Sequence, residues 1–159
     1  MDTILIRPIC PEDREGIETY FDRLKGEAAV FFNPGDYNRL RFRNYFDGKL
    51  KNLTAFVAED IDNKQIAGMV FLSASQYLVP LLGIGIDAAY SGRGLGVRLM
   101  EYIHSYAQAH GIGGILLNVH FANTRAQALY AKMGYEQMGI SNQGQFLYIK
   151  RFLAENREV

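Results

Sequence analysis

The sequence predicts a mixed α/β fold in which helices pack on a sheet within a single domain. The first observation is an apolar run, residues 78–86, that leads through a glycine-rich turn into a segment of helical periodicity. The second is the order of strand-like and helix-like patterns along the chain, which is β-α-α-β-β-β-α-β-α-β-β. The third is size, since 159 residues with 48% hydrophobic content suffice for one core.

The N-terminal part predicts a strand and then a helix. Residues 3–9 alternate, with Ile4 and Ile6 on one face and Pro8 near the end. The run Pro11-Glu12-Asp13 is typical of a helix start, because proline is tolerated in the first turn and acids favour the positive end of the helix dipole. The apolar face of this helix is predicted to be Ile17, Tyr20, Phe21 and Leu24.

Residues 26–48 combine loop signals with aromatic and basic side chains. Gly26, Asn33-Pro34-Gly35 and Gly48 punctuate the segment, so we expect a loop followed by a short helix over residues 36–46. The aromatic cluster fits either a cap on the core or a ligand pocket. It comprises Phe31, Phe32, Tyr37, Phe42, Tyr45 and Phe46, interspersed with Arg39, Arg41 and Arg43.

The middle of the chain predicts three strands. Residues 53–59 and 65–73 flank a polar turn and are predicted to form a hairpin. Residues 78–86 are predicted to form the strand that leads into the glycine turn. Gly83 and Gly85 lie inside that strand, where glycine often marks a bulge or a close backbone approach.

The C-terminal part predicts helix, strand, helix and a final strand pair. A helix over residues 94–109 ends at His110-Gly111, and residues 114–119 form a buried strand. Asn123 is placed to cap the next helix, which Gly134 closes. Strands follow at 135–140 and 145–152, around Asn142-Gln143-Gly144. Residues 1–153 are thus one domain, and 154–159 a polar, frayed tail.

Composition excludes several classes of function. Lys+Arg and Asp+Glu are 17 each, which argues against a general nucleic-acid or membrane-surface binder. The single cysteine, Cys10, excludes an intrachain disulfide and a cysteine-rich zinc site, and no metal is expected. No apolar run approaches the length of a membrane span, and the N-terminus lacks a signal-peptide core, so the expected compartment is the cytoplasm.

The glycine-rich turn Ser91-Gly92-Arg93-Gly94-Leu95-Gly96-Val97 has the properties of a phosphate cradle. Unpaired N–H groups and the dipole at a helix start attract anions, and glycines allow a close approach. Arg93 and Arg98 add charge nearby. The alternative is a simple strand-to-helix turn. The run Gly83-Ile84-Gly85-Ile86-Asp87-Ala88 fits the dinucleotide pattern, but its glycines lie within a strand, which disfavours a nicotinamide cofactor.

Two segments together resemble the GNAT superfamily of acetyl-CoA-dependent N-acetyltransferases. Residues 86–96 match its coenzyme A pyrophosphate loop, although Ser91 stands where Arg or Gln is usual. Residues 117–119 and 123–135 match its strand and its Asn-x-x-Ala-x-x-Leu-Tyr-x-x-x-Gly-aromatic helix. The resemblance implies a mostly antiparallel sheet of six to seven strands, with splayed central parallel strands and about four helices.

The resemblance also implies the cofactor and its contacts. Acetyl-CoA is expected as co-substrate, its pantetheine arm lying between residues 81–86 and 115–119. The diphosphate is expected on the N–H groups from Gly92 to Val97. The residues expected to bind coenzyme A are Ile84, Ile86, Ser91, Gly92, Arg93, Gly94, Leu95, Gly96, Val97, Asn123 and Tyr130.

Tyr130 matches the family's general acid, which protonates the leaving thiolate while an amine attacks the thioester directly in a ternary complex. Packing on a helix face is the alternative role. No residue is assignable as the general base. The candidates are Glu59, Asp60, Asp87 and His120, each of which would take the proton of the amine through a chain of water molecules.

The acceptor is expected to be a primary amine of a small molecule, peptide or protein, recognised by residues 31–46. The aromatic and arginine side chains there suggest an acceptor with apolar and anionic parts. A homodimer is left open as the assembly. Two alternatives also remain: a non-catalytic acyl-CoA-binding or sensing module, which would keep the loop and lose the chemistry, and a structural partner domain that does not bind coenzyme A.

Overall fold

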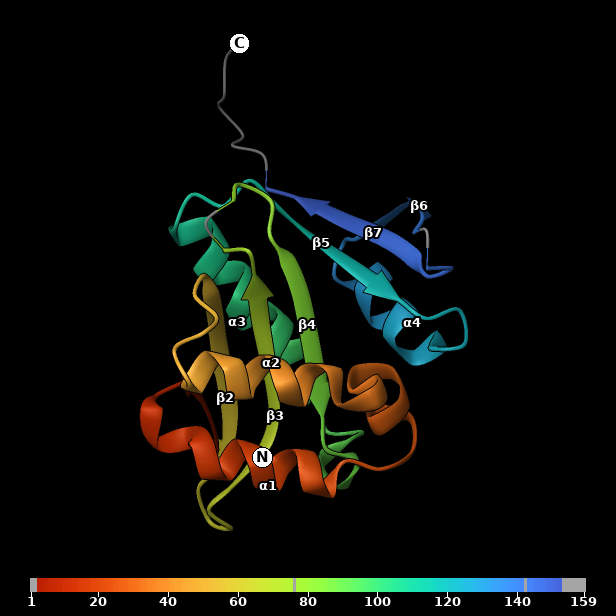
Figure 1. The fold of residues 1–159 in the computed structure, drawn as a ribbon. Helices are drawn as coiled ribbons and strands as arrows, with labels where there is room; N and C mark the ends of the chain where they lie inside the picture. The colour runs from red at the N-terminus through yellow and green to blue at the C-terminus, as the bar shows by residue number, and fades with distance from the viewer. Residues whose placement is uncertain (1–2, 76, 142, 153–159) are drawn as a thin grey trace.

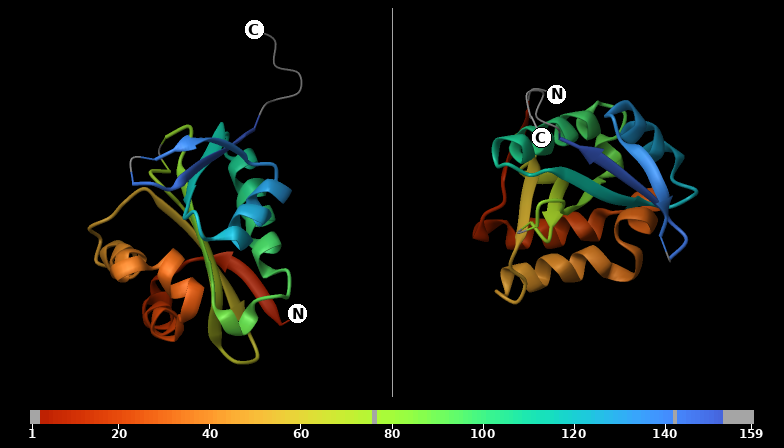
Figure 2. Two further views of the ribbon diagram at one scale, coloured as in Figure 1. Left: turned by 90° about the vertical axis from the view of Figure 1, so that its right-hand side faces the viewer. Right: turned by 90° about the horizontal axis from the view of Figure 1, so that it is seen from above.

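The computed structural model describes residues 3–75, 77–141 and 143–152 and shows one seven-stranded sheet with helices on both faces (Figures 1 and 2). The element order predicted from the sequence is confirmed. The strands are β1 (Ile4–Pro8), β2 (Leu53–Asp60), β3 (Gln65–Ser73), β4 (Leu81–Ile86), β5 (Gly114–Val119), β6 (Glu136–Ile140) and β7 (Phe146–Arg151). The main helices are α1 (Arg14–Arg23), α2 (Tyr37–Phe46), α3 (Leu95–Ala109) and α4 (Thr124–Lys132).

The sheet order is β1-β2-β3-β4-β5-β7-β6, and every neighbouring pair is antiparallel except β4 and β5. These two parallel strands meet only near their N-terminal ends, where Leu81 pairs with Leu116 and the Leu116 N–H donates to Pro80 C=O at 3.0 Å. Beyond that point they diverge, which is visible in Figure 1. The splayed central pair expected from the family resemblance is therefore confirmed.

Two apolar clusters hold the helices to opposite faces of the sheet. On one face α3 buries Leu95, Leu99, Ile103 and Ala107, the residues whose four-residue spacing predicted a helix. On the other face α1 buries Ile17, Tyr20 and Phe21, and its C-cap residue Leu24 is buried as well, as predicted. Figure 2 shows the resulting three-layer arrangement, with α1 and α2 on one side of the sheet and α3 and α4 on the other.

Several predicted boundaries were wrong. The strand expected from residue 78 begins at Leu81. The side chain of Leu78 is exposed, and Pro80 has no backbone N–H to donate to a neighbouring strand. The helix expected at Pro11 begins as a 3₁₀ turn over Pro11–Asp13, and α1 starts at Arg14. The expected loop before α2 contains a π-helical turn, η2 (Ala28–Phe32). The predicted tail, 154–159, and Asn142 lie outside the described residues.

Gly83 and Gly85 permit the close approach that glycine inside a strand suggested. A Cβ atom at Gly83 would overlap the ring of Phe71, and one at Gly85 would overlap the ring of Phe32. These aromatic rings therefore pack directly against the β4 backbone on the face covered by α1 and α2. The glycines serve ring packing within a strand and do not form a dinucleotide turn.

The substitution Gly85→Ala is expected to lower the free energy of unfolding by about 1–3 kcal/mol, because the added methyl group overpacks the core against Phe32. Chemical denaturation of both proteins measures the difference. Gly139→Ala is the matched control, since a Cβ there meets no atom within 4 Å. Equal denaturation midpoints for Gly85→Ala and Gly139→Ala would contradict the packing argument.

Candidate active site

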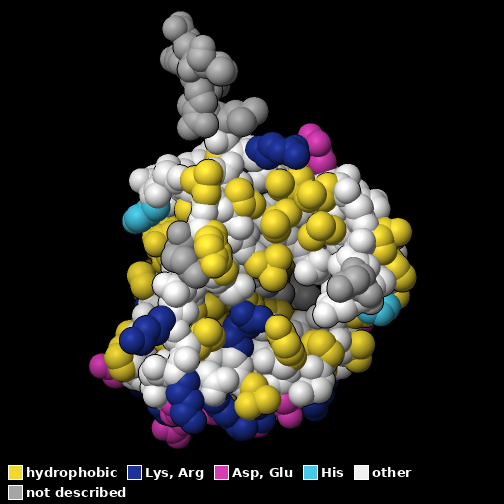
Figure 3. Space-filling view, turned by 45° about the horizontal axis from the view of Figure 1, so that its top comes forward, with side chains coloured by type: hydrophobic (Ala, Val, Ile, Leu, Met, Phe, Trp, Pro, Cys, Tyr) yellow, Lys and Arg dark blue, Asp and Glu magenta, His cyan; other side chains and the backbone are white. Residues whose placement is uncertain are grey.

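A cavity of about 970 Å³ occupies the gap where β4 and β5 diverge. Its walls come from both faces of the sheet: the start of α3 and one side of α4 on one face, and η2 and α2 on the other. In the space-filling view a hollow opens between largely hydrophobic side chains (Figure 3). A cavity that crosses the sheet in this way lets two ligands approach each other from opposite faces.

The glycine-rich turn forms one end of this cavity. Gly92 and Gly94 have φ values of 77° and 76°, a left-handed conformation that favours glycine, and a Cβ at either would meet no atom within 4 Å. The first intrahelical hydrogen bond of α3 runs from the Arg98 N–H to Gly94 C=O. The N–H groups of residues 95–97 therefore have no helical acceptor and are free for a ligand.

Ten of the eleven residues predicted to bind coenzyme A line this cavity. They are Ile84, Ile86, Ser91, Gly92, Gly94, Leu95, Gly96, Val97, Asn123 and Tyr130. Arg93 is the exception, because its guanidinium lies over the ring of Tyr90, 5.5 Å from the centroid. The Arg93 side chain thus packs on Tyr90, which itself lines the cavity.

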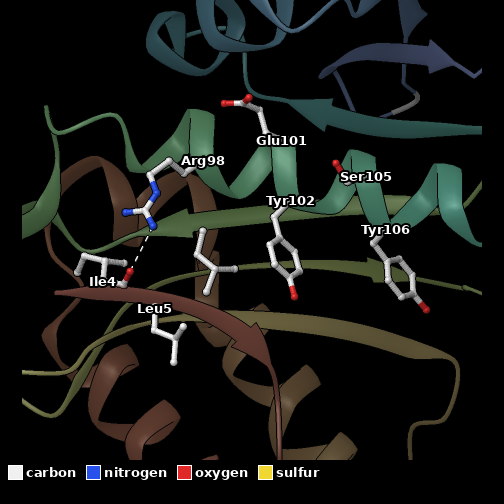
Figure 4. A pocket seen from close by; sticks show the side chains of 8 residues that line it. Ile4, Leu5, Arg98, Glu101, Tyr102, Ser105 and Tyr106 are labelled. Carbon is white, nitrogen blue, oxygen red and sulfur yellow. Dashed lines mark hydrogen bonds between the residues drawn. The ribbon is translucent and has the colours of Figure 1, made fainter. Parts of the chain in front are cut away.

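Arg98 points away from the cavity. It donates to the backbone C=O of Ile4 at 3.2 Å, beside a second hollow of about 690 Å³ between β1 and α3 (Figure 4). None of the residues predicted to bind a ligand lines that hollow. Arg98 therefore does not bring its charge to the phosphate turn, whereas Arg93 stays within it. Lys25 and Arg125, which the sequence did not single out, line the larger cavity.

The β4 backbone offers polar groups to the gap. The Asp87 N–H donates to Ala67 C=O of the β3 side at 2.9 Å, which fixes the register of the antiparallel pair. Hydrogen-bonding direction alternates along a strand, so the backbone groups of residues 83 and 85 face β3 as well. Those of Ile84 and Ile86 face the opposite edge, where β5 has moved away.

Two buried carboxylates brace the turn between β4 and α3. Asp87 accepts from the Ala89 N–H and from Arg23 Nε, each at 3.0 Å. Asp60 accepts from the Tyr90 hydroxyl at 2.6 Å, and this hydrogen bond lowers the pKa of the Asp60 carboxyl. Both side chains are occupied by structural partners and neither lines the cavity. They hold the turn in shape and are poorly placed to act as bases.

Tyr130 and Asn123 come from α4 and its N-terminus. The Asn123 side chain accepts from the Ala126 N–H at 3.3 Å, so the predicted helix cap is confirmed. Tyr130 is 6% exposed and lines the cavity, and its hydroxyl has no hydrogen-bond partner among the described residues. Burial raises the pKa of the Tyr130 phenol, so it stays protonated at neutral pH.

Of the four candidates for a general base, His120 alone lines the cavity. Glu59 pairs with Arg7 at 3.0 Å, and the two aspartates brace the turn. His120 Nδ1 accepts from the Ala122 N–H at 3.0 Å, so the neutral ring carries its proton on Nε2 and presents a donor there. Glu27, missed from the sequence, is the carboxylate that lines the cavity within the described part of the chain.

The aromatic cluster of residues 31–46 serves both roles left open by the sequence. Phe42 is buried in the core, Phe31 and Tyr37 line the cavity, and Phe32 does both. The three arginines also divide. Arg39 and Arg43 pair with acids of α1, and Arg41 lines the cavity.

Within residues 3–75, 77–141 and 143–152, no group of three or more His, Cys, Asp or Glu side chains is placed to hold a metal ion. In the same ranges, no helix combines the length and the apolar character needed to cross a bilayer.

Comparison with known proteins places the chain in a family. The sequence profile described as the Acetyltransferase (GNAT) family matches residues 18–135. The N-alpha-acetyltransferase RimI of Mycobacterium tuberculosis is 39% identical over 57 residues, covering 36% of this chain and 34% of that protein. The mycothiol acetyltransferase of Corynebacterium glutamicum is 35% identical over 75 residues, covering 46% of this chain and 26% of that protein.

Both matches span less than two thirds of the relative's own length. Among solved structures, the GNAT domain of PAT from S. lividans shares the fold with a TM-score of 0.80 at 18% identity, covering 92% of this chain and 89% of that one. The profile covers most of the chain, and the splayed sheet agrees with it. This chain therefore belongs to the GNAT acetyltransferase family.

Proposed function

We propose that this protein transfers the acetyl group of acetyl-CoA to a primary amine that attacks the thioester directly. The observation that carries the proposal is one cavity that gathers free N–H groups at the start of α3, the open backbone edge of β4 and the hydroxyl of Tyr130. Acetyl-CoA would supply an acyl group activated by its thiol leaving group. The names of the relatives are consistent with amine acceptors in a small molecule or a polypeptide.

Each part of the cavity has a role in this reaction. The N–H groups of residues 95–97 would hold the diphosphate, where the dipole of α3 adds positive charge. A backbone N–H near Ile86 would donate to the thioester oxygen and stabilise its developing negative charge. The amine nitrogen bonds to the carbonyl carbon, and the carbon–sulfur bond breaks. Tyr130 gives its proton to the sulfur, and the proton that the nitrogen loses passes through water to restore the phenol.

The contacts of the candidate bases favour acceptors that need little help to lose a proton. Asp60, Asp87 and Glu59 are paired, and His120 presents a donor. An α-amine with a pKa of about 8 is roughly one tenth neutral at pH 7, whereas a lysine at about 10.4 is almost wholly charged. We therefore propose α-amines and other weakly basic amines as the better acceptors.

Calorimetry and a turnover screen test the proposal. Coenzyme A and acetyl-CoA are titrated into the protein, and free thiol is then followed with polyamines, amino acids, aminoglycosides and peptides with free N-termini. Binding together with amine-dependent thiol release is the expected result. Binding without release for any amine would favour a non-catalytic acyl-CoA-binding module. A protein that binds neither coenzyme form would overturn the proposal.

A further inference from the structure

The arginines of α2 have different partners. Arg43 Nε donates to Glu18 Oε2 at 2.6 Å, and Arg39 lies 2.5 Å from Asp22 Oδ1 and 3.5 Å from Glu18. Arg41 has no carboxylate within ion-pair distance among the described residues, although it carries the same charge. Arg41 therefore brings an unneutralised positive charge to the wall of the cavity.

The Arg41 guanidinium is nevertheless held in place. Its central carbon lies 5.2 Å from the ring centroid of Tyr37 and 5.1 Å from that of Phe71, which are cation–π distances. Its Nε donates to Asn38 Oδ1 at 3.1 Å, and buried Asn38 in turn donates to the backbone C=O of Phe32. With Nε occupied, the two terminal amino groups are left to bind a planar, two-oxygen anion.

The position of Arg41 relates it to the acceptor. Phe71 packs against Gly83 of β4, so the guanidinium lies above the strand whose backbone edge opens into the gap. It does so on the face of α1 and α2, whereas the glycine turn and α4 approach from the other face. A group bound by Arg41 would thus reach β4 from the side opposite to the diphosphate site.

We infer that the acceptor is an amine that also carries a carboxylate, and that Arg41 is the residue that selects it. This inference rests on the proposed function and names the substrate class for the same site. The carboxylate binds the terminal amino groups of Arg41 while the amine of the same molecule points to the gap between β4 and β5. Polyamines bring only positive charge to this wall and are rejected.

The test compares free amino acids with their α-carboxamides as acceptors, at saturating acetyl-CoA. The wild-type protein is expected to prefer the carboxylate by about 10- to 100-fold in kcat/KM, the value of a charge-assisted contact. The carboxamide has the less basic amine, because it lacks the neighbouring negative charge, so amine reactivity alone would give the opposite preference. Arg41→Gln is expected to bring the ratio close to one with the KM for acetyl-CoA unchanged.

Arg43→Gln is the matched control, since it removes an arginine from the same helix but outside the cavity, and it is expected to keep the preference. Arg41→Lys should retain part of the preference for the carboxylate. An equal or reversed preference in the wild type, or the same ratio in Arg41→Gln, would overturn the inference.

If no amine is turned over, the proposed transferase function fails separately. In that case the role of Arg41 is decided by the binding of N-acetyl amino acids and their amides to the CoA-saturated protein. Binding that needs both the carboxylate and Arg41 supports the inference, and any other result overturns it.

Discussion

Replacing Tyr130 with phenylalanine is expected to lower kcat at least about 100-fold and to change the dissociation constant for acetyl-CoA by less than about threefold. The ring stays in the core, so the loss is confined to one hydroxyl that lines the cavity without a protein partner. Without a proton, the thiolate is a poorer leaving group than the neutral amine that has just added to the thioester carbon. Burial raises the pKa of the Tyr130 phenol, so the hydroxyl keeps its proton at neutral pH until a thiolate forms beside it.

Tyr148→Phe is the matched control for this prediction. Tyr148 is buried on β7 with its ring 6.3 Å from that of Tyr130, but it does not line the cavity. Removing its hydroxyl tests whether any lost phenol in this part of the core slows the reaction. Steady-state kinetics at neutral pH and calorimetry with acetyl-CoA supply the two measurements. A kcat for Tyr130→Phe within about threefold of the wild type would remove Tyr130 from the chemistry.

Local pattern was enough to predict the parts of the site that depend on backbone conformation. The strand, the turn at residues 91–97 and α3 follow one another in sequence, so their geometry is set by glycine positions and helical spacing. Asn123 caps its own helix three residues on, which is again a local interaction. These features needed no knowledge of distant contacts.

Side-chain direction depended on contacts that the sequence does not state. Arg98 directly follows the turn in sequence, yet its side chain reaches Ile4, 94 positions away. The roles of Asp60 and Asp87 were equally hidden, because their partners Tyr90 and Arg23 are 30 and 64 positions away. Long-range pairing decided which charges stayed free.

One signal in the sequence could have separated the arginines of α2. Arg39 and Arg43 are four residues apart and share a helix face, as do Glu18 and Asp22 on α1. Such matched pairs on neighbouring helices favour ion pairing. Arg41 lies on a different face of α2 because it is two residues from each of the others.

The stability of the protein is expected to fall by about 2–3 kcal/mol between pH 7 and pH 4.5 through one histidine. His104 of α3 is 8% exposed, and burial, with a smaller effect of the Lys150 charge, lowers its pKa from 6.5 to about 4. Its Nε2 is 2.8 Å from the Tyr135 hydroxyl, and the Tyr135 ring lies 5.8 Å from that of Tyr130. A neutral His104 thus supports the packing behind the proposed acid.

The sign of the effect follows from proton binding. Between pH 6.5 and 4 the unfolded chain binds a proton at residue 104 that the folded protein excludes, so the free energy of unfolding is greatest above pH 6.5 and decreases as the pH falls. His104→Gln can keep a hydrogen bond to Tyr135 but cannot titrate. The carboxylates contribute to the stability of both proteins, so their contribution cancels when the denaturation series of the variant across this pH range is subtracted from that of the wild type. The wild-type value minus the variant value should fall by about 2–3 kcal/mol towards acid pH. Two parallel series would show that His104 is protonated in the folded protein as easily as in the unfolded chain.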